Sequence, residues 1–280
     1  MADKVVDQIN AKSAEEIKDV TIIDLQMNSI SDAATLSICV NLVKLNLAKN
    51  KLKSLAPFCT DEAFPNLKWL DVSNNKFSDF PAIKCPKLEY LDISYNKLEK
   101  VSEAWTGHDR LRIVKSIDNK FKNLAPFKSM PKLEELYMAQ NLVSTLTGWE
   151  SLPVLRKLHL RKNKIEKMPE EEMPDLPALE YLNLRRNNIE KIEVIEKLFQ
   201  FKMLTDINVL NNPIDQNASS KDLLFAQVLS KNPAIKRFNK QQVTEKNLWQ
   251  AVHYGQYKFE KDEKERKRLE ALEAAKAEAE

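Results

Sequence analysis

An asparagine recurs along this chain at intervals of 21 to 25 residues, and this spacing restricts the possible folds more than any other feature of the sequence. Each asparagine occupies the same place in the template L-x-x-L-x-L-x-x-N-x-L, as in the copy formed by Leu155, Leu158, Leu160, Asn163 and Ile165. A regular period of this length is typical of solenoids, in which each repeat packs only against its neighbours. The recurring residues are Asn28, Asn50, Asn75, Asn96, Asn119, Asn141, Asn163, Asn187 and Asn212.

The template is that of leucine-rich repeats of the roughly 22-residue class. Its leucines point inward from a short strand, so each repeat buries its apolar row only when a neighbour stacks on it. The sequence therefore predicts an α/β leucine-rich-repeat solenoid of about nine repeats, with a parallel sheet on the concave side. The fifth copy is irregular because Ser116 replaces an apolar residue.

The repeated asparagine has a separate structural task. Its amide can donate and accept at once, so a buried column of asparagines can satisfy main-chain groups where the chain turns away from each strand. Loss of one such residue should cost about 1–3 kcal/mol, which is typical of a buried polar group without a partner. The return segments carry a three-residue apolar period, which predicts a tight turn or a single 3₁₀ coil, as in the run from Val143 to Leu155. The segments SLAPF (54–58) and NLAPF (123–127) recur at equivalent points, where proline should interrupt any longer helix.

Four segments follow from these patterns. Residues 1–19 are expected to form an N-terminal cap, and residues 20–215 the repeats. Residues 216–246 read as a C-terminal cap made of a helix and a strand-like hook, which would cover the last apolar row. Residues 247–280 begin with an aromatic stretch and continue as a charged helical tail. We expect the aromatic stretch to anchor on the last repeat or a neighbouring subunit, and the tail to gain order only against a partner.

Composition excludes several classes of function. The formal net charge of +3 gives no reason to expect nucleic acid, and no apolar run approaches the roughly 18 residues that span a bilayer. The first residues carry acids where a signal peptide would be apolar, so we expect an intracellular protein that does not bind membranes. Cys39, Cys59 and Cys85 match no metal spacing and are expected to be buried thiols, and no cofactor is predicted.

Residues between the leucines should point into the concave face, which predicts a protein-binding surface. Exposed aromatic residues beside charge are typical of contact hot spots. The three histidines of the chain form no catalytic constellation, so the sequence predicts no enzyme activity. Three candidate groups emerge: an aromatic and acidic patch of Trp69, Asp71, Tyr90, Asp92 and Tyr95, a basic patch of Arg156, Lys157, His159, Arg161, Lys162, Tyr181, Arg185 and Arg186, and the tail residues Trp249, Tyr254 and Tyr257.

Several runs between the template leucines also resemble one particular family. The runs LYMAQN (136–141), LHLRKN (158–163) and LNLRRN (182–187), with the cap around residues 233–238, resemble the leucine-rich-repeat-containing protein twenty-three family. These are radial spoke proteins of cilia and flagella. The resemblance implies a structural subunit of the axoneme, within a large complex, that contacts spoke-head or stalk proteins. Similar repeats occur in a regulatory subunit of the type-one protein phosphatase and in an axonemal dynein light chain, and both alternatives stay open.

Overall fold

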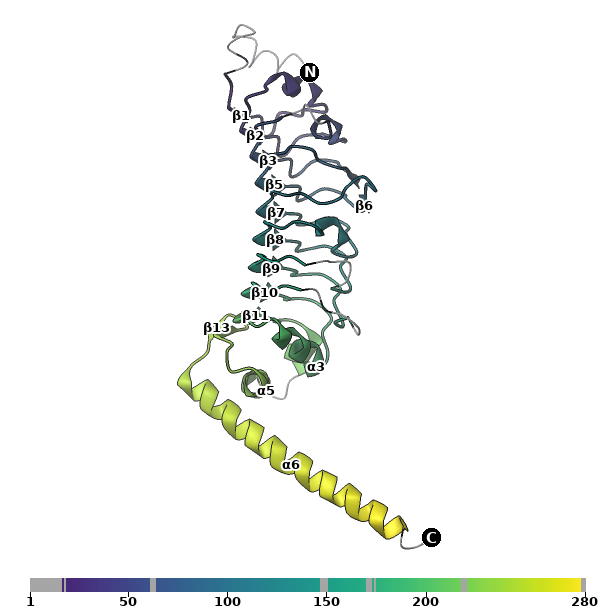
Figure 1. Ribbon diagram of the computed structural model, residues 1–280, viewed down its shortest axis with the longest axis vertical. Helices are drawn as coiled ribbons and strands as arrows, with labels where there is room; N and C mark the ends of the chain where they lie inside the picture. The colour runs from purple at the N-terminus through teal and green to yellow at the C-terminus, as the bar shows by residue number, and fades with distance from the viewer. Residues whose placement is uncertain are drawn as a thin grey trace.

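The computed structural model of the chain describes residues 17, 19–60, 64–146, 151–169, 173, 175–217 and 221–277. Its strands lie on one side of an elongated stack and the return segments on the other (Figure 1). The main sheet has 11 strands in the order β1-β2-β3-β5-β7-β8-β9-β10-β11-β12-β13. The nine template copies supply β1 Ile22–Asp24, β2 Lys44–Asn46, β3 Trp69–Asp71, β5 Tyr90–Asp92, β7 Ile113–Lys115, β8 Glu135–Tyr137, β9 Lys157–His159, β10 Tyr181–Asn183 and β11 Asp206–Asn208.

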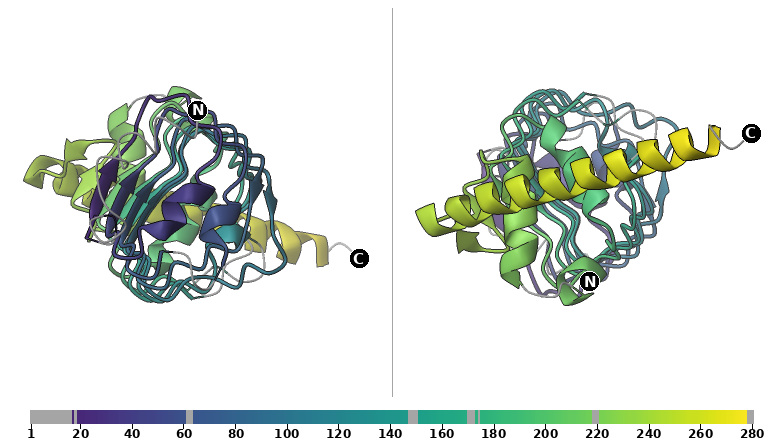
Figure 2. Two further views of the ribbon diagram at one scale, coloured as in Figure 1. Left: turned by 90° about the horizontal axis from the view of Figure 1, so that it is seen from above. Right: turned by 90° about the horizontal axis from the view of Figure 1, so that it is seen from below.

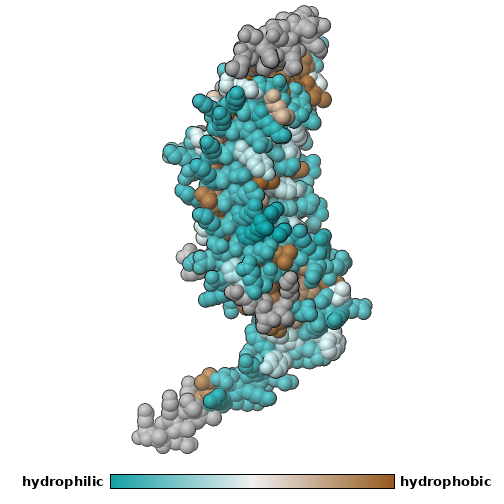
Figure 3. All heavy atoms as spheres, turned by 180° about the vertical axis from the view of Figure 1, so that it is seen from behind, coloured by the Kyte–Doolittle hydropathy of each residue, from teal (hydrophilic) through white to brown (hydrophobic). Residues whose placement is uncertain are grey.

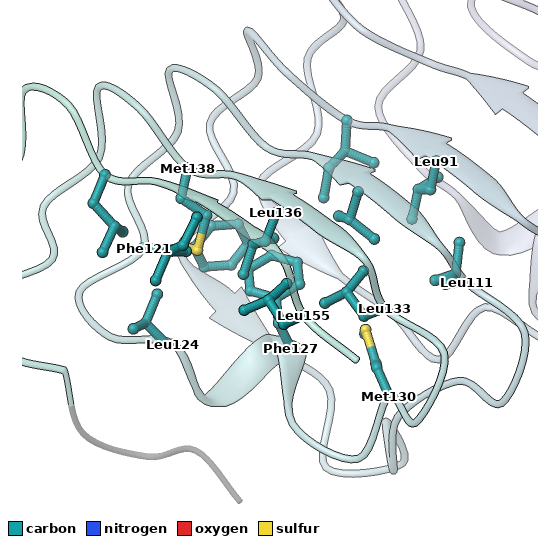
Figure 4. Packing of buried hydrophobic residues seen from close by; sticks show 14 of the residues in the cluster. Leu91, Leu111, Phe121, Leu124, Phe127, Met130, Leu133, Leu136, Met138 and Leu155 are labelled. Carbon is teal, nitrogen blue, oxygen red and sulfur yellow. The ribbon is translucent and has the colours of Figure 1, made fainter. Parts of the chain in front are cut away.

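All nine of these strands are parallel and in equivalent register, which confirms the predicted solenoid. Leu136 of β8 pairs with Val114 and Leu158, the central residues of the neighbouring strands. These central residues are fully buried, because the next repeat covers each row. Figure 4 shows Phe121 and Phe127 of the return path packing toward leucines of the strands in the same interior.

The irregular fifth repeat keeps the same geometry despite its serine. Ser116 is completely buried, and its main-chain N–H donates to Tyr137 in the next repeat. Its hydroxyl lies 3.4 Å from Nδ2 of Asn119, where other repeats place a main-chain carbonyl. A polar side chain therefore fits this core position because the asparagine beside it is a hydrogen-bond partner.

The return path contains short 3₁₀ helices in several repeats, whereas the run from Val143 to Leu155 lies partly outside the described residues. Both APF segments form one, η2 at Ala56–Phe58 and η3 at Ala125–Phe127, and η1 covers Ala34–Ile38. Between them, β4 Asp79–Phe80 and β6 Lys100–Val101 form a second, two-stranded parallel sheet. The eighth repeat returns through α3 Ile192–Glu196 and η4 Lys197–Gln200.

The predicted asparagine column is present from the second repeat onward. Asn163 is typical: its Oδ1 accepts from the main-chain N–H of Val143 at 3.0 Å, and its Nδ2 donates to the carbonyls of Met138 and Leu160 at 2.9 and 3.0 Å. Each amide thus joins its own turn to the turn of the preceding repeat. Asn28 differs because it is exposed, and its Nδ2 donates to Gln26 within the same turn.

The residue before each of these asparagines adopts a left-handed conformation, which the sequence analysis did not anticipate. None of the nine is a glycine, and their φ angles lie between 54° and 62°. Left-handed backbone costs an ordinary L-residue roughly 1–2 kcal/mol. We call this set the turn column; it comprises Met27, Lys49, Asn74, Tyr95, Asp118, Gln140, Lys162, Arg186 and Asn211.

The C-terminal cap has the predicted helix and hook. After α4 at Pro213–Asn217, α5 spans Lys221–Lys231, and β12 at Arg237–Phe238 adds a parallel strand to β11. A further antiparallel strand, β13 at Gln241–Gln242, closes the sheet and was not predicted. The predicted N-terminal cap lies almost wholly outside the described residues, which include Ile17 and Asp19 of it.

The tail forms one helix, α6, from Glu245 to Ala277. It lies across the C-terminal end of the solenoid, packs against α5 and projects beyond the stack (Figures 1 and 2). The helix begins before the predicted tail boundary because Thr244 caps it. The Thr244 hydroxyl accepts from the main-chain N–H of Asn247 at 3.3 Å, and Oδ1 of Asn247 accepts from the main-chain N–H of Thr244 at 3.0 Å.

Candidate protein-binding face

The solvent side of the main sheet, which we call the strand face, carries two columns of side chains. On each strand the residue before the buried central residue and the residue after it point outward, because side chains alternate along a strand. Trp69, Tyr90 and Tyr181 occupy the first column, whereas Tyr137 and His159 occupy the second. Each of these five rings is half-buried by its neighbours.

The predicted aromatic patch is a close stack. The rings of Trp69 and Tyr90 lie 5.0 Å apart and are inclined by 7°. A lysine flanks each side of the pair: Nζ of Lys44 lies 4.5 Å from the Trp69 ring centre, and Nζ of Lys115 lies 5.3 Å from that of Tyr90. Both ammonium groups are thus placed for cation–π attraction.

The stack continues onto the strands of the predicted basic patch. Nζ of Lys115 also lies 5.8 Å from the ring of Tyr137, which stacks on His159 at 4.3 Å. His159 in turn lies 4.8 Å from Tyr181. Two patches that the sequence treated as separate are therefore one surface. We call it the aromatic ladder; it runs through Lys44, Trp69, Tyr90, Lys115, Tyr137, His159 and Tyr181 on seven adjacent strands.

Lys44, Lys115 and Tyr137 were missed by the sequence analysis. Aligning the repeats on their asparagines would have placed these residues on the two outward columns. That alignment cannot reveal that Lys115 reaches rings on both sides, because this depends on the direction of its long side chain.

The acidic residues of the aromatic patch lie beside the ladder. Asp71 and Asp92 are on adjacent strands, and each Oδ1 accepts from the main-chain N–H two residues on, at 2.9 Å. Burial raises the pKa of Asp71, and the charge of Asp92 adds to this effect. Burial, followed by these two carboxylates, also raises the pKa of Tyr90. Tyr95 lies in the turn column and is about half exposed, so it is beside the ladder rather than within it.

The pKa of His159 bears on its predicted place in the basic patch. Burial lowers its pKa to about 4, although the charge of Glu135 acts in the opposite direction. At pH 7 the imidazole is therefore neutral and acts as an aromatic ring between two tyrosines. Lys157 and Arg156 are also balanced, because Lys157 bonds Glu135 at 2.8 Å and Arg156 forms a bidentate pair with Glu180.

Four cations of the predicted basic patch remain together at the turns. Arg161 and Lys162 follow β9, and Arg185 and Arg186 follow β10. Because those strands are neighbours, the four side chains form an array two residues wide and two repeats long. We call these residues the basic array.

The predicted tail residues differ in burial and in their contacts with α5. Tyr254 anchors α6, because Gln227 of α5 donates to its hydroxyl at 3.1 Å and Ala251 is buried one turn away. Trp249 and Tyr257 are 62% and 65% exposed, so they do not anchor on the last repeat of this chain, and the alternative of a neighbouring subunit stays a prediction. They flank the anchored face, and a helix can bury only one stripe on a single neighbour.

A groove of about 430 Å³ lies between the two terminal helices. Gly255 lies on its α6 side, where an added Cβ would come no closer than 3.7 Å to Ser230. The groove is lined by Leu229, Ser230, Pro233, Leu248, Ala251, Val252, Gly255 and Gln256. By contrast, the face in Figure 3 is mainly hydrophilic, with small and separate apolar spots.

His108 and the three cysteines lie in the interior of the fold or at its edge. Nε2 of His108 lies 2.9 Å from the carbonyl of Cys85, and its Nδ1 accepts from two main-chain N–H groups. Cys39 and Cys85 are buried as predicted, whereas Cys59 is half-buried. Within the described part of the chain, no three His, Cys, Asp or Glu side chains gather as a metal site would require. In the part of the chain that the structure describes, no helix is both long enough and apolar enough to cross a bilayer.

Comparison with known proteins identifies the repeats. A family model described as "Leucine Rich repeats (2 copies)" matches residues 65–104, and one described as "Leucine rich repeat" matches residues 153–214. Osteomodulin from Bos taurus is 29% identical over 148 residues, which cover 50% of this chain and 34% of that protein. The chain therefore spans about a third of the length of this curated relative.

Solved structures share the fold at low identity. An internalin (inlF) from Listeria monocytogenes aligns with a TM-score of 0.53 at 19% identity, over 83% of this chain and 71% of that one. TLR13 in its complex with ssRNA13 aligns with a TM-score of 0.65 at 20% identity, over 87% of this chain and 39% of that one. Together with the repeat geometry, these matches show that the chain is a leucine-rich-repeat solenoid, an architecture that serves as a protein–protein interaction scaffold.

Proposed function

We propose that this chain is a non-catalytic scaffold that binds a protein along its aromatic ladder, as a structural subunit of the radial spoke in the axoneme of cilia or flagella. The ladder carries the protein-binding part of the proposal. Its half-buried rings are already held by stacking, so a partner can bury their exposed faces at little further cost in side-chain entropy.

The dimensions of the ladder suit one segment of a partner. Seven adjacent strands are separated by six steps of about 4.8 Å, so the ladder extends over roughly 29 Å. An α-helix of about 19 residues has this length. The carboxylates of Asp71 and Asp92 lie near one end and the basic array near the other, which would fix the direction of a bound segment.

The spoke assignment is supported by residues outside the leucine template. The runs LYMAQN and LHLRKN, which resemble the spoke family, supply Tyr137 and His159 of the ladder. LHLRKN and LNLRRN also supply all four residues of the basic array. The resemblance therefore includes surface positions that the fold itself leaves free. These positions favour a spoke-head or stalk partner and placement in the cytoskeleton of the axoneme.

Affinity capture from isolated axonemes tests this proposal. The wild-type chain should retain spoke-head or stalk proteins, identified by mass spectrometry, and the double variant Trp69→Ala/Tyr90→Ala should lose them while keeping its thermal unfolding temperature. Trp249→Ala/Tyr257→Ala is the matched control, because it removes an exposed tryptophan and tyrosine from α6 instead.

Other outcomes would overturn parts of the proposal. Retention of a phosphatase catalytic subunit or a dynein heavy chain in place of spoke proteins would support the alternative regulatory or light-chain function. Loss of spoke proteins in the α6 variant but not in the ladder variant would move the contact to the tail.

A further inference from the structure

Ion pairing distinguishes the basic array from the arginines that precede the strands. Just before the strands, Arg112 forms a bidentate pair with Glu134 of the next repeat, and Arg156 forms one with Glu180. The array has no equivalent pair among the described residues, which is the observation that calls for an explanation. Further ion pairs between neighbouring repeats include Lys68–Glu89, Lys122–Glu99, Lys157–Glu135 and Arg237–Asp206.

Neutral side chains hold two of the four cations. Nε of Arg185 donates to Oδ1 of Asn211 at 3.0 Å, and Nζ of Lys162 donates to Oε1 of Gln140 at 3.3 Å. Gln140 donates in turn to Asp118 at 3.1 Å, so an amide stands between that carboxylate and Lys162. These contacts orient the cations and leave their charge uncompensated.

Arg161 adds a second observation. Its Nε is buried and has no hydrogen-bond partner. A buried donor on a charged group without an acceptor is costly. A carboxylate bound beside the guanidinium would not reach Nε, but it would compensate the positive charge that the described residues leave unpaired. His159, on the strand that leads into the array, is neutral at pH 7 and adds no charge.

From this arrangement we infer that the basic array is a binding site for an acidic peptide segment, in which carboxylates of glutamate or aspartate pair with Arg161, Lys162, Arg185 and Arg186. The site rests on the proposed protein-binding function and specifies its chemistry. Neighbouring repeats place equivalent cations about 4.8 Å apart, and carboxylates on one face of a helix are separated by about 5–6 Å. The end of the aromatic ladder at Tyr181 lies beside the array and would cover apolar parts of the same segment.

Fluorescence anisotropy with a labelled hexaglutamate peptide tests the site. The wild-type chain should bind this probe at low salt and lose affinity as salt rises. The variant Arg161→Gln/Arg185→Gln should bind about tenfold more weakly, because two charge-assisted contacts are removed. Lys162→Gln/Arg186→Gln should act similarly, and it covers the case in which removing the partly buried Arg161 disturbs the fold. Arg112→Gln/Arg156→Gln removes the same charge from paired positions and should change affinity less than about twofold.

Three results would overturn the inference. Equal loss in the Arg112/Arg156 control would show nonspecific attraction, and failure of the wild-type chain to bind hexaglutamate at low salt would exclude the site. Tighter binding of a six-nucleotide single-stranded RNA than of the peptide would assign the array to phosphate. Trp69→Ala/Tyr90→Ala should bind hexaglutamate normally. The two proposals can fail separately. If the array does not bind hexaglutamate but the ladder variant still loses the captured partner protein, the acidic-peptide site is excluded and the proposed function stands.

Discussion

The solenoid and the C-terminal helix α6 differ in how far their apolar side chains are buried. In the solenoid, Leu158 is 1% exposed because the repeats on either side cover it. On α6, Phe259 is 69% exposed and Leu269 is 53% exposed, because α5 covers only the stripe around Ala251. Stability in the repeats is therefore shared between neighbours, whereas most of α6 depends on its own helix propensity.

The largest contrast should be in amide hydrogen exchange. In the free protein, amides of β8 and β9 should exchange only through global unfolding, and those of residues 260–270 should exchange through local fraying at almost no free-energy cost. Mass-spectrometric exchange on the isolated chain measures both. When α6 is docked in an assembly, residues 260–270 should become slow. Strong protection there in the free monomer would show that α6 is stabilised by its own chain and would remove the contrast.

Truncating one leucine in each region should show the same contrast as a difference in the free energy of unfolding. Leu158→Ala should cost about 2–5 kcal/mol because it leaves a cavity between three repeats. Leu269→Ala should change the free energy by less than about 0.5 kcal/mol, since its side chain is already in solvent. Urea unfolding of both variants provides the measurement, and similar losses would contradict the proposed difference.

The asparagine column allows a finer comparison within the solenoid itself. Asn163→Ala should cost about 1–3 kcal/mol, because the main-chain groups it joins would lose buried partners. Asn28→Ala should cost less, since Asn28 is exposed and bonds Gln26 in its own turn. If both changes shift the urea midpoint equally, the column is not stabilised by joining adjacent turns.

A pH titration tests the environment of His159. Its folded pKa of about 4 lies below the unfolded value of about 6.5, so the unfolded state binds more protons between these pH values. The associated stability is complete above pH 6.5 and is lost as the pH falls toward 4. Because the ring is partly solvated, we expect about 1 kcal/mol, or a decrease in Tm of about 2–4 °C.

The variant His159→Phe keeps an aromatic ring in the ladder and removes this titration. Its Tm should depend less on pH between 7 and 5 than that of the wild type, as measured by differential scanning calorimetry. His108 contributes to the pH dependence that remains, because burial lowers its pKa as well. An unchanged pH dependence in His159→Phe would mean that the ring is not buried in solution.

The fold could be predicted from the sequence because one period determines both the strands and the asparagine column. The positions of Leu136 and Asn163 in the template already fix which side chains lie inside. The start of α6 was also readable, since Thr244 and Asn247 stand at the spacing of a capping box. The helix begins at Glu245, slightly before the segment boundary at residue 247, because that boundary marks a change in composition rather than the cap.

The binding surface was less predictable because it depends on contacts between columns. Periodicity places Trp69 and Tyr90 side by side, but it does not show that Lys115 links them to Tyr137. It also cannot give the charge of His159, which is set by burial between two tyrosines. The sequence therefore predicted an aromatic patch on repeats three and four and a basic patch on repeats seven and eight, without the link through Lys115 and Tyr137.

The turn column has a consequence for how such a surface can diversify. A left-handed residue is ordinarily glycine, yet these nine turns all carry side chains, including Tyr95, Lys162 and Arg186. The next residue's amide, rather than the identity of the turn residue, therefore holds the bend in the buried repeats. One position per repeat can therefore vary in side chain to suit a binding partner while the architecture is kept, provided that the residue tolerates left-handed backbone.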